Sequence, residues 1–148
     1  MTKIDFYILE QQGEARARFA CRLAEKAWQQ GNKVYIHTAS AEQSRQLDEL
    51  LWTFRVGSFV PHSLDDDANA GSTPIHIGHG EEPQGPQHYD QVLINLAPQV
   101  PLFFSRFERV AEVVDQDEEV RKLGRERFRF YRDRGYPLEN HPINAGQG

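Results

Sequence analysis

The order of short apolar runs and helical segments constrains the fold of this chain more than any other feature. The runs are rich in β-branched and aromatic residues and end at polar turns, as strands do, and the longer segments repeat apolar residues at helical spacing. The predicted strands are 3–9, 33–38, 74–77, 91–96 and 109–114, and the predicted helices are 14–30, 41–51 and 118–134. This order predicts an α/β domain at 1–138, with a mainly parallel sheet and helices on both faces. Residues 139–148 are expected to form a flexible C-terminal tail.

The composition is that of a folded, acidic protein. The chain has 148 residues, of which 39% are hydrophobic and 26% charged, and this suits one domain with its own core. The formal net charge of −5 disfavours non-specific binding of nucleic acid, because phosphate contacts need clustered cations. The single cysteine, Cys21, cannot form an internal disulfide and is expected to be buried. We see no signal peptide and no membrane-spanning run, so we expect a cytoplasmic protein without membrane contact.

Motifs for nucleotide binding and catalysis are not visible in the sequence. Residues 9–14 form the first strand-to-helix turn, where a nucleotide-binding fold would carry phosphate-binding glycines. This turn has one glycine and two acidic residues, which would repel a phosphate. A pair of glycines, at residues 78 and 80, is followed by acidic residues and a proline rather than by a helix. We find no P-loop and no nucleophile elbow, and we therefore expect a protein that is not an enzyme and that binds no cofactor.

Two groups of residues in the sequence could supply metal ligands. His76, His79 and His88 lie on a short strand and a loop, without helical spacing or an acidic second layer of ligands. Residues 65–67 are three consecutive aspartates, without the alternating spacing and the glycine of a calcium loop. We interpret both groups as solvated or locally hydrogen-bonded side chains, and we predict no metal site.

The helix predicted at 118–134 carries seven basic and four acidic residues, so it is cationic in an anionic protein. At about 3.6 residues per turn, Arg121, Arg125, Arg129 and Arg132 form one stripe, and Phe128 lies at its border. Val120, Leu123, Gly124, Phe130 and Tyr131 are predicted to face the sheet. Two interpretations stay open: a solvated charged face, or a surface where guanidinium groups hold carboxylates of an acidic peptide beside an apolar notch.

Six segments of the chain resemble, in the same order, segments of the DNA polymerase III chi subunit family. They are residues 6–9, 31–36, 47–52, 58–62, 93–96 and 125–132. The resemblance covers the chain to about residue 138. It implies a Rossmann-like α/β fold without a nucleotide site. It also implies a non-catalytic accessory subunit that bridges the clamp-loader complex, through the psi subunit, to the acidic C-terminal tail of single-stranded-DNA-binding protein.

The resemblance also assigns residues to these two partners. The family's tail pocket uses a Lys, an Arg, a Tyr and a Lys of the last helix, and these positions match Arg121, Arg125, Phe128 and Arg129. Arg132 continues the same stripe. At position 128 a Phe stands for the family's Tyr, which keeps the ring and removes the hydroxyl. The short acidic segment Asp115-Gln116-Asp117 before the helix is a second departure and could alter the rim of the pocket.

The psi surface is predicted at Phe59, Val60 and Pro61, from the family's Ser-Phe-Val-Pro-His stretch. Apolar residues in such a turn-rich connection either are exposed anchors or cap the sheet, and the sequence leaves both open.

Two other functions are alternatives to the adaptor: a nucleotide-dependent enzyme, and direct binding of single-stranded DNA by the Arg and aromatic residues. The net charge and the interleaved acidic residues argue against the second, so we expect contact with nucleic acid only through partner proteins.

Overall fold

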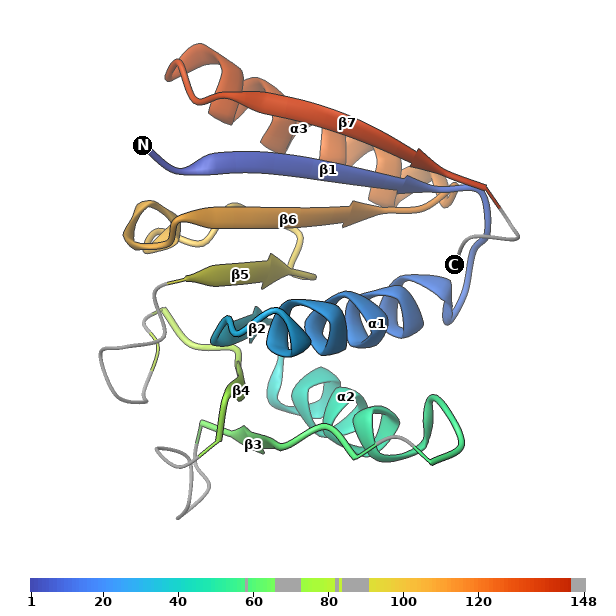
Figure 1. Cartoon of the computed structure of the whole chain (residues 1–148). Coiled ribbons are helices and arrows are strands. Elements are labelled where there is room, and N and C mark those ends of the chain that lie inside the picture. The colour runs from blue at the N-terminus through green and yellow to red at the C-terminus, as the bar shows by residue number, and fades with distance from the viewer. Residues whose placement is uncertain (58, 66–72, 82, 84–90, 145–148) are drawn as a thin grey trace.

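A computed structural model describes residues 1–57, 59–65, 73–81, 83 and 91–144. The elements alternate along the chain in the order expected for an α/β protein (Figure 1). The strands are β1 (Lys3–Leu9), β2 (Val34–His37), β3 (His62–Leu64), β4 (Ile75–Gly78), β5 (Val92–Asn95), β6 (Arg109–Val114) and β7 (Leu138–Ile143). The helices are α1 (Ala15–Gln29), α2 (Ala41–Thr53) and α3 (Glu118–Asp133), with a short 3-10 turn η2 (Phe104–Arg106) before β6.

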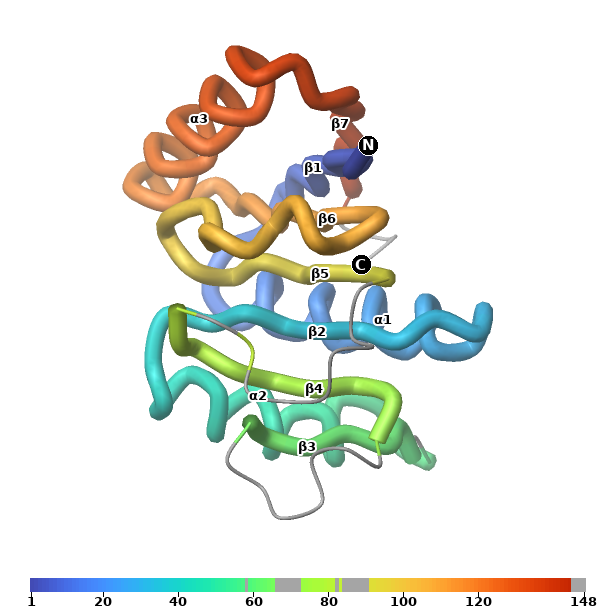
Figure 2. Tube along the Cα trace, turned by 90° about the vertical axis from the view of Figure 1, so that its left-hand side faces the viewer, coloured from blue at the N-terminus to red at the C-terminus, as the bar shows by residue number. Residues whose placement is uncertain are grey.

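The strands form one sheet of seven in the order β3-β4-β2-β5-β6-β1-β7, and all neighbours are parallel. Helices α1 and α2 lie on one face and α3 lies on the other (Figures 1 and 2). The prediction of an α/β fold with a parallel sheet and helices on both faces is therefore confirmed. Within the described residues, no helix combines the length and the apolarity that crossing a bilayer requires.

Each face of the sheet has its own core. On the side of α1 and α2, the aliphatic residues of β2 and β4 pack with Leu47, Leu51 and the buried Cys21. Cys21 is fully buried in this core, which confirms its expected packing role, and the burial raises the pKa of its thiol to about 12. On the side of α3, an aromatic core fills the space between helix and sheet. Its members are Ile4, Phe6, Tyr35, Leu93, Phe103, Phe104, Phe107, Val110, Val114 and Tyr131.

Two strands of the sheet were not predicted, and one of them lies where a flexible tail was expected. Residues 138–143 form β7, which pairs with β1 from Ile4↔Leu138 to Leu9↔Ile143. The flexible tail predicted at 139–148 is therefore wrong for 139–143, and residues 145–148 lie outside the described part of the chain. The other missed strand is β3, which is three residues long. Both lie at the edges of the sheet, where one side of a strand is solvated and the apolar signal is weak.

Side-chain contacts to Asp5 hold β7 to the sheet. Asp5 is buried, its Oδ1 lies 2.9 Å from His141 Nε2, and its Oδ2 accepts a hydrogen bond of 2.9 Å from Arg109 Nη2. The His141 ring stacks on Tyr7 at a centroid distance of 4.9 Å. Burial alone would raise the pKa of Asp5, but hydrogen bonds from His141 and Arg109 and the charges of Arg109 and Lys3 lower it below its usual value.

We expect Asp5 to make folding stability depend on pH in the acidic range. Because its pKa is lower folded than unfolded, ionised Asp5 stabilises the protein above its ordinary pKa, near 3.8. That stability is lost as the pH falls through the lowered value. Urea unfolding should therefore show wild type more stable than Asp5→Asn at pH 7, with the difference shrinking towards pH 3. Glu139→Gln, at an exposed neighbour, is the control, and a difference that does not change with pH would contradict the assignment.

Candidate functional site

Helix α3 begins and ends at clear signals in its sequence. Asp117 is the N-cap, and its Oδ2 accepts a hydrogen bond of 3.1 Å from the backbone N–H of Val120. Glu118 and Glu119 lie in the first turn, where the helix dipole favours negative charge. After the helix, Gly135 takes a φ of 80°, which residues other than glycine rarely adopt. The helix thus crosses the face of β6 and β1 from a fixed starting point.

One arginine of α3 points inward and anchors the helix. Arg127 is only 4% exposed, and its Nε donates a hydrogen bond of 2.8 Å to Oε1 of the fully buried Glu112 on β6. Tyr131 donates to Oε2 of the same carboxylate at 2.7 Å, and Asn95 Nδ2 donates to both oxygens at 3.1 and 3.0 Å. Arg127 Nη1 also donates to the carbonyl of Pro98 at 2.9 Å. Burial, and then the charge of Glu112, raises the pKa of Tyr131, so its hydroxyl stays a donor.

The sequence pattern did not separate Arg127 from the other basic residues of α3. The face predicted to meet the sheet was Val120, Leu123, Gly124, Phe130 and Tyr131, whereas the buried residues are Gly124, Arg127 and Tyr131. Residue 127 lies three positions after Gly124 and four before Tyr131, on the same face of the helix. The spacing could have identified it, but an arginine is rarely buried unless it is paired, and its partner Glu112 lies on another element.

The remaining arginines of the stripe face solvent. Arg121, Arg125, Arg129 and Arg132 are all exposed. Arg132 Nη2 lies 3.2 Å from Asp133 Oδ1, so this guanidinium is partly neutralised by its neighbour. Arg134 lies with its guanidinium carbon 3.5 Å from the centroid of the Phe130 ring, at the end of the helix. The cationic stripe predicted from spacing is therefore present, with Arg127 excluded from it.

A pocket of about 300 Å³ opens beside this stripe, between α3 and the last strands of the sheet. It is lined by Phe6, Ile8, Val114, Arg121, Gly124, Arg125, Phe128 and Asn140. Phe128 packs edge-on against Phe6 at a centroid distance of 5.3 Å. Gly124 brings α3 close to β6, since a Cβ there would lie 2.9 Å from Cγ2 of Val114. The site is thus an apolar hollow with two guanidinium-bearing residues at its helix side.

The pocket brings together three of the five residues predicted for tail binding. Arg121, Arg125 and Phe128 line it, while Arg129 and Arg132 are exposed and do not belong to its lining. Asn140 lines it from β7 and was missed, because the sequence analysis placed that residue in a flexible tail. The pattern of residues 138–143 alternates poorly between apolar and polar, so only the pairing of β7 with β1 brings Asn140 to the pocket.

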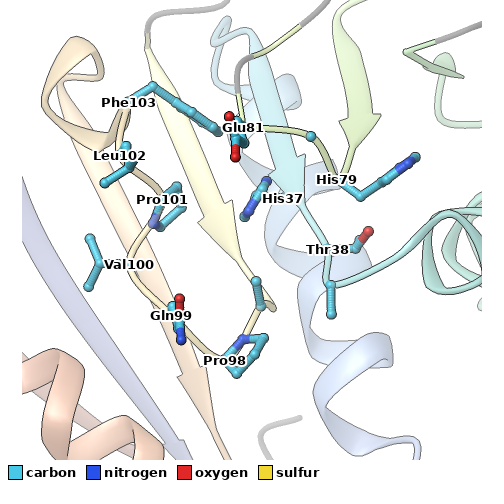
Figure 3. Close-up of a pocket in the computed structure, with 13 residues that line it drawn as sticks. His37, Thr38, His79, Glu81, Pro98, Gln99, Val100, Pro101, Leu102 and Phe103 are labelled. Carbon is cyan, nitrogen blue, oxygen red and sulfur yellow. The ribbon is translucent and has the colours of Figure 1, made fainter.

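A second pocket of about 300 Å³ lies at the carboxyl ends of β2, β4 and β5, where nucleotides bind in related folds (Figure 3). It is lined by residues 97–103, which follow β5, and by residues at or just after the ends of β2 and β4: His37, Thr38, Ala39, His79, Gly80 and Glu81. None of these residues is Lys or Arg, and Glu81 is acidic. Burial, and then the nearby His79, lowers the pKa of His37 to about 4, so its ring is neutral at pH 7. This lining is poorly suited to a phosphate.

One group of possible metal ligands stands out among the described residues: Asp5, Glu139 and His141. Cationic side chains already contact it, since Lys3 Nζ lies 3.1 Å from Glu139 Oε2 and Arg109 binds Asp5. These cations compete with any metal.

The possible metal ligands named from the sequence form local contacts where the structure describes them. His76 contacts Asp65, which also accepts a hydrogen bond of 3.0 Å from Tyr35. His88, Asp66 and Asp67 lie outside the described residues.

The segment predicted to bind psi divides between surface and core. Phe59 and Pro61 are exposed, Phe59 at 79%, whereas Val60 is fully buried and packs in the core on the side of α2. Two further apolar side chains nearby are exposed, Trp52 at 55% and Val56. Trp52 was missed because it lies at the end of α2, where helical spacing alone did not separate it from the core. The exposed apolar side chains are Trp52, Val56, Phe59 and Pro61, and we call this set the apolar edge patch.

The fold and the pocket define a Rossmann-like α/β protein whose last helix frames an apolar hollow with arginines. A family model described as DNA polymerase III chi subunit, HolC, matches residues 1–139. The DNA polymerase III subunit chi of Pseudomonas aeruginosa is 48% identical over 97% of this chain and 98% of its own length. That of Escherichia coli is 29% identical over 93% of this chain and 96% of its own length. The chain therefore belongs to the DNA polymerase III chi subunit family.

Membership of this family makes the chain an accessory subunit of DNA polymerase III, acting in DNA replication. Among solved structures, the crystal structure of T4 UvsW aligns with 97% of this chain at a TM-score of 0.66 and 9% identity. The aligned part is 42% of the UvsW chain. At this identity the likeness concerns the fold alone, and it supports the Rossmann-like assignment.

The buried ion pair of α3 predicts a large effect of one substitution. Glu112→Ala leaves Arg127 buried without its counter-ion, which should cost about 3–5 kcal/mol of the free energy of unfolding in urea. The double variant Glu112→Leu/Arg127→Met replaces both charges by apolar groups and should recover most of the loss. A loss below about 1 kcal/mol in the single variant would show that the pair does not hold the helix.

Proposed function

We propose that this protein bridges the clamp loader, through psi, to the acidic C-terminal tail of single-stranded-DNA-binding protein. The observation that carries the proposal is the pocket between α3 and β7, in which an apolar floor adjoins Arg121 and Arg125. A tail that ends in phenylalanine offers both complements at once: a ring for the hollow, and carboxylates for the guanidinium groups. In this role the protein is a non-catalytic adaptor.

The chemistry of the pocket suits an aromatic side chain with carboxylates close to it. Phe6, Ile8, Val114 and Phe128 supply the apolar surface, so burying an aromatic ring there is favourable. Arg121 and Arg125 are one helical turn apart and can engage the terminal carboxylate and an aspartate close to it. Arg129 and Arg132 lie further along the same stripe, outside the lining, and would contribute longer-range attraction to the acidic tail.

The second partner, psi, is assigned to the apolar edge patch. Its side chains are Trp52, Val56, Phe59 and Pro61, and exposed apolar side chains gathered in one short stretch are typical of protein interfaces. Val60 would support the segment from the core rather than contact psi. The patch extends from the last turn of α2 to the residue before β3. Strand β3 is one edge of the sheet and β7, which adjoins the pocket, is the other (Figure 1). The two partners could therefore bind at the same time.

Truncating one pocket arginine tests the tail assignment. Arg125→Ala should weaken binding of a fluorescent acidic peptide ending in phenylalanine by about 1.5–3 kcal/mol, the usual worth of a charged hydrogen bond. Fluorescence polarisation measures this, and affinity for wild type should fall with rising salt. Arg18→Ala, which removes the same charge from α1 on the opposite face, is the matched control. Equal affinities for wild type and Arg125→Ala would remove the pocket from the proposal.

The psi assignment is tested by one substitution in the apolar edge patch. Phe59→Ser should reduce co-purification with co-expressed psi at least tenfold, because an exposed aromatic anchor is lost. Because the Phe59 side chain is exposed, the variant should keep its fold, and thermal unfolding checks this. The same variant should bind the tail peptide as tightly as wild type. Tight binding of wild type to a single-stranded oligonucleotide, with no other protein present, would instead favour direct recognition of DNA.

A further inference from the structure

Asn140 reaches the pocket of α3 from the strand side. It is opposite Phe6 in the ladder between β7 and β1, and paired residues of neighbouring strands direct their side chains to the same face. That face is the one covered by α3, because Phe6 belongs to the core beneath the helix. The pocket therefore has Arg121 and Arg125 on its helix side and an amide on its strand side.

The amide of Asn140 can both donate and accept hydrogen bonds. In the described part of the chain, no hydrogen bond engages this side chain, and the residue is exposed at the edge of the sheet. Other side chains of β7 are occupied differently, since His141 binds Asp5 and Glu139 lies beside Lys3 on the opposite face. The Asn140 amide takes no part in these contacts, so its NH₂ group and its carbonyl oxygen are available to a ligand.

We propose that Asn140 is a specificity residue that recognises the free end of the bound chain. The inference rests on the proposed function of the pocket. Nδ2 donates a hydrogen bond to a terminal carboxylate oxygen that the arginines leave open, and Oδ1 accepts from the N–H of the last residue. A carboxylate has about four acceptor sites on its two oxygens, and guanidinium groups that approach only from the helix side leave the sites that face Asn140 open. Arginine alone attracts any acidic segment, whereas the amide selects a chain terminus.

Binding of two peptides to purified full-length protein tests this inference. Both have the same acidic sequence ending in phenylalanine, one with a free carboxylate and one with a C-terminal amide. Wild type should prefer the free carboxylate, and Asn140→Ala should reduce that preference roughly tenfold, as for a hydrogen bond to a charged group. Asn140→Asp places a carboxylate next to the ligand's own, so it should bind the free-acid peptide still more weakly and affect the amidated peptide less.

A matched variant and a second comparison separate the possible failures. Asn144→Ala changes the same residue type just beyond β7, outside the lining of the pocket, and should leave the preference unchanged. Thermal unfolding checks that each variant is folded. If Arg125→Ala weakens binding while both Asn140 variants match wild type, the role of Asn140 is wrong and the pocket stands. If wild type binds neither peptide, the proposed function fails together with this inference.

Discussion

Glu112 and Arg127 form an ion pair inside the protein, between the strand β6 and the helix α3. Isolated charges in such surroundings would be strongly destabilising, but here Tyr131 and Asn95 complete the hydrogen bonds of the carboxylate. Because these hydrogen bonds form only at particular distances and angles, they hold α3 at one rotation about its axis. The contact between Arg127 and the Pro98 carbonyl also ties α3 to the connection between β5 and β6.

The rotation of α3 determines what the protein presents to partners. With Arg127 turned inward, Arg121 and Arg125 are placed at the mouth of the pocket and Phe128 lies over Phe6. Gly124 allows the helix to approach β6 closely, so the hollow lies beside the helix rather than beneath it. An arginine-rich helix would by itself be a solvated charged face. The adjoining apolar hollow is the feature that makes selective capture of an acidic chain end a physically reasonable proposal.

Separation of the two candidate surfaces follows from the strand order. The chain places β3 and β7 at opposite edges of the sheet, and the apolar edge patch and the pocket lie near these edges. The sheet between them has a core on each face, and in the proposed adaptor role such a packed interior would keep the two surfaces at a fixed separation. In the pocket at the carboxyl ends of β2, β4 and β5, where related folds bind nucleotides, the described lining residues include two prolines and Glu81, and none of them is Lys or Arg.

The sequence by itself determined those strands and helices whose apolar pattern, cap or terminal glycine lies within or next to the element. The strands around Phe6, Ile36 and Ile94 are buried runs, and α3 has its cap, its period and its terminal glycine, so the fold class and the outward arginine stripe could be predicted. Tertiary structure alone decided the inward turn of Arg127, the burial of Val60 and the place of Asn140 in the pocket. Each of these depends on a partner distant in sequence: Glu112, the core beside α2, and β1. Periodicity reports which face of an element a residue occupies, but only packing decides what that face meets.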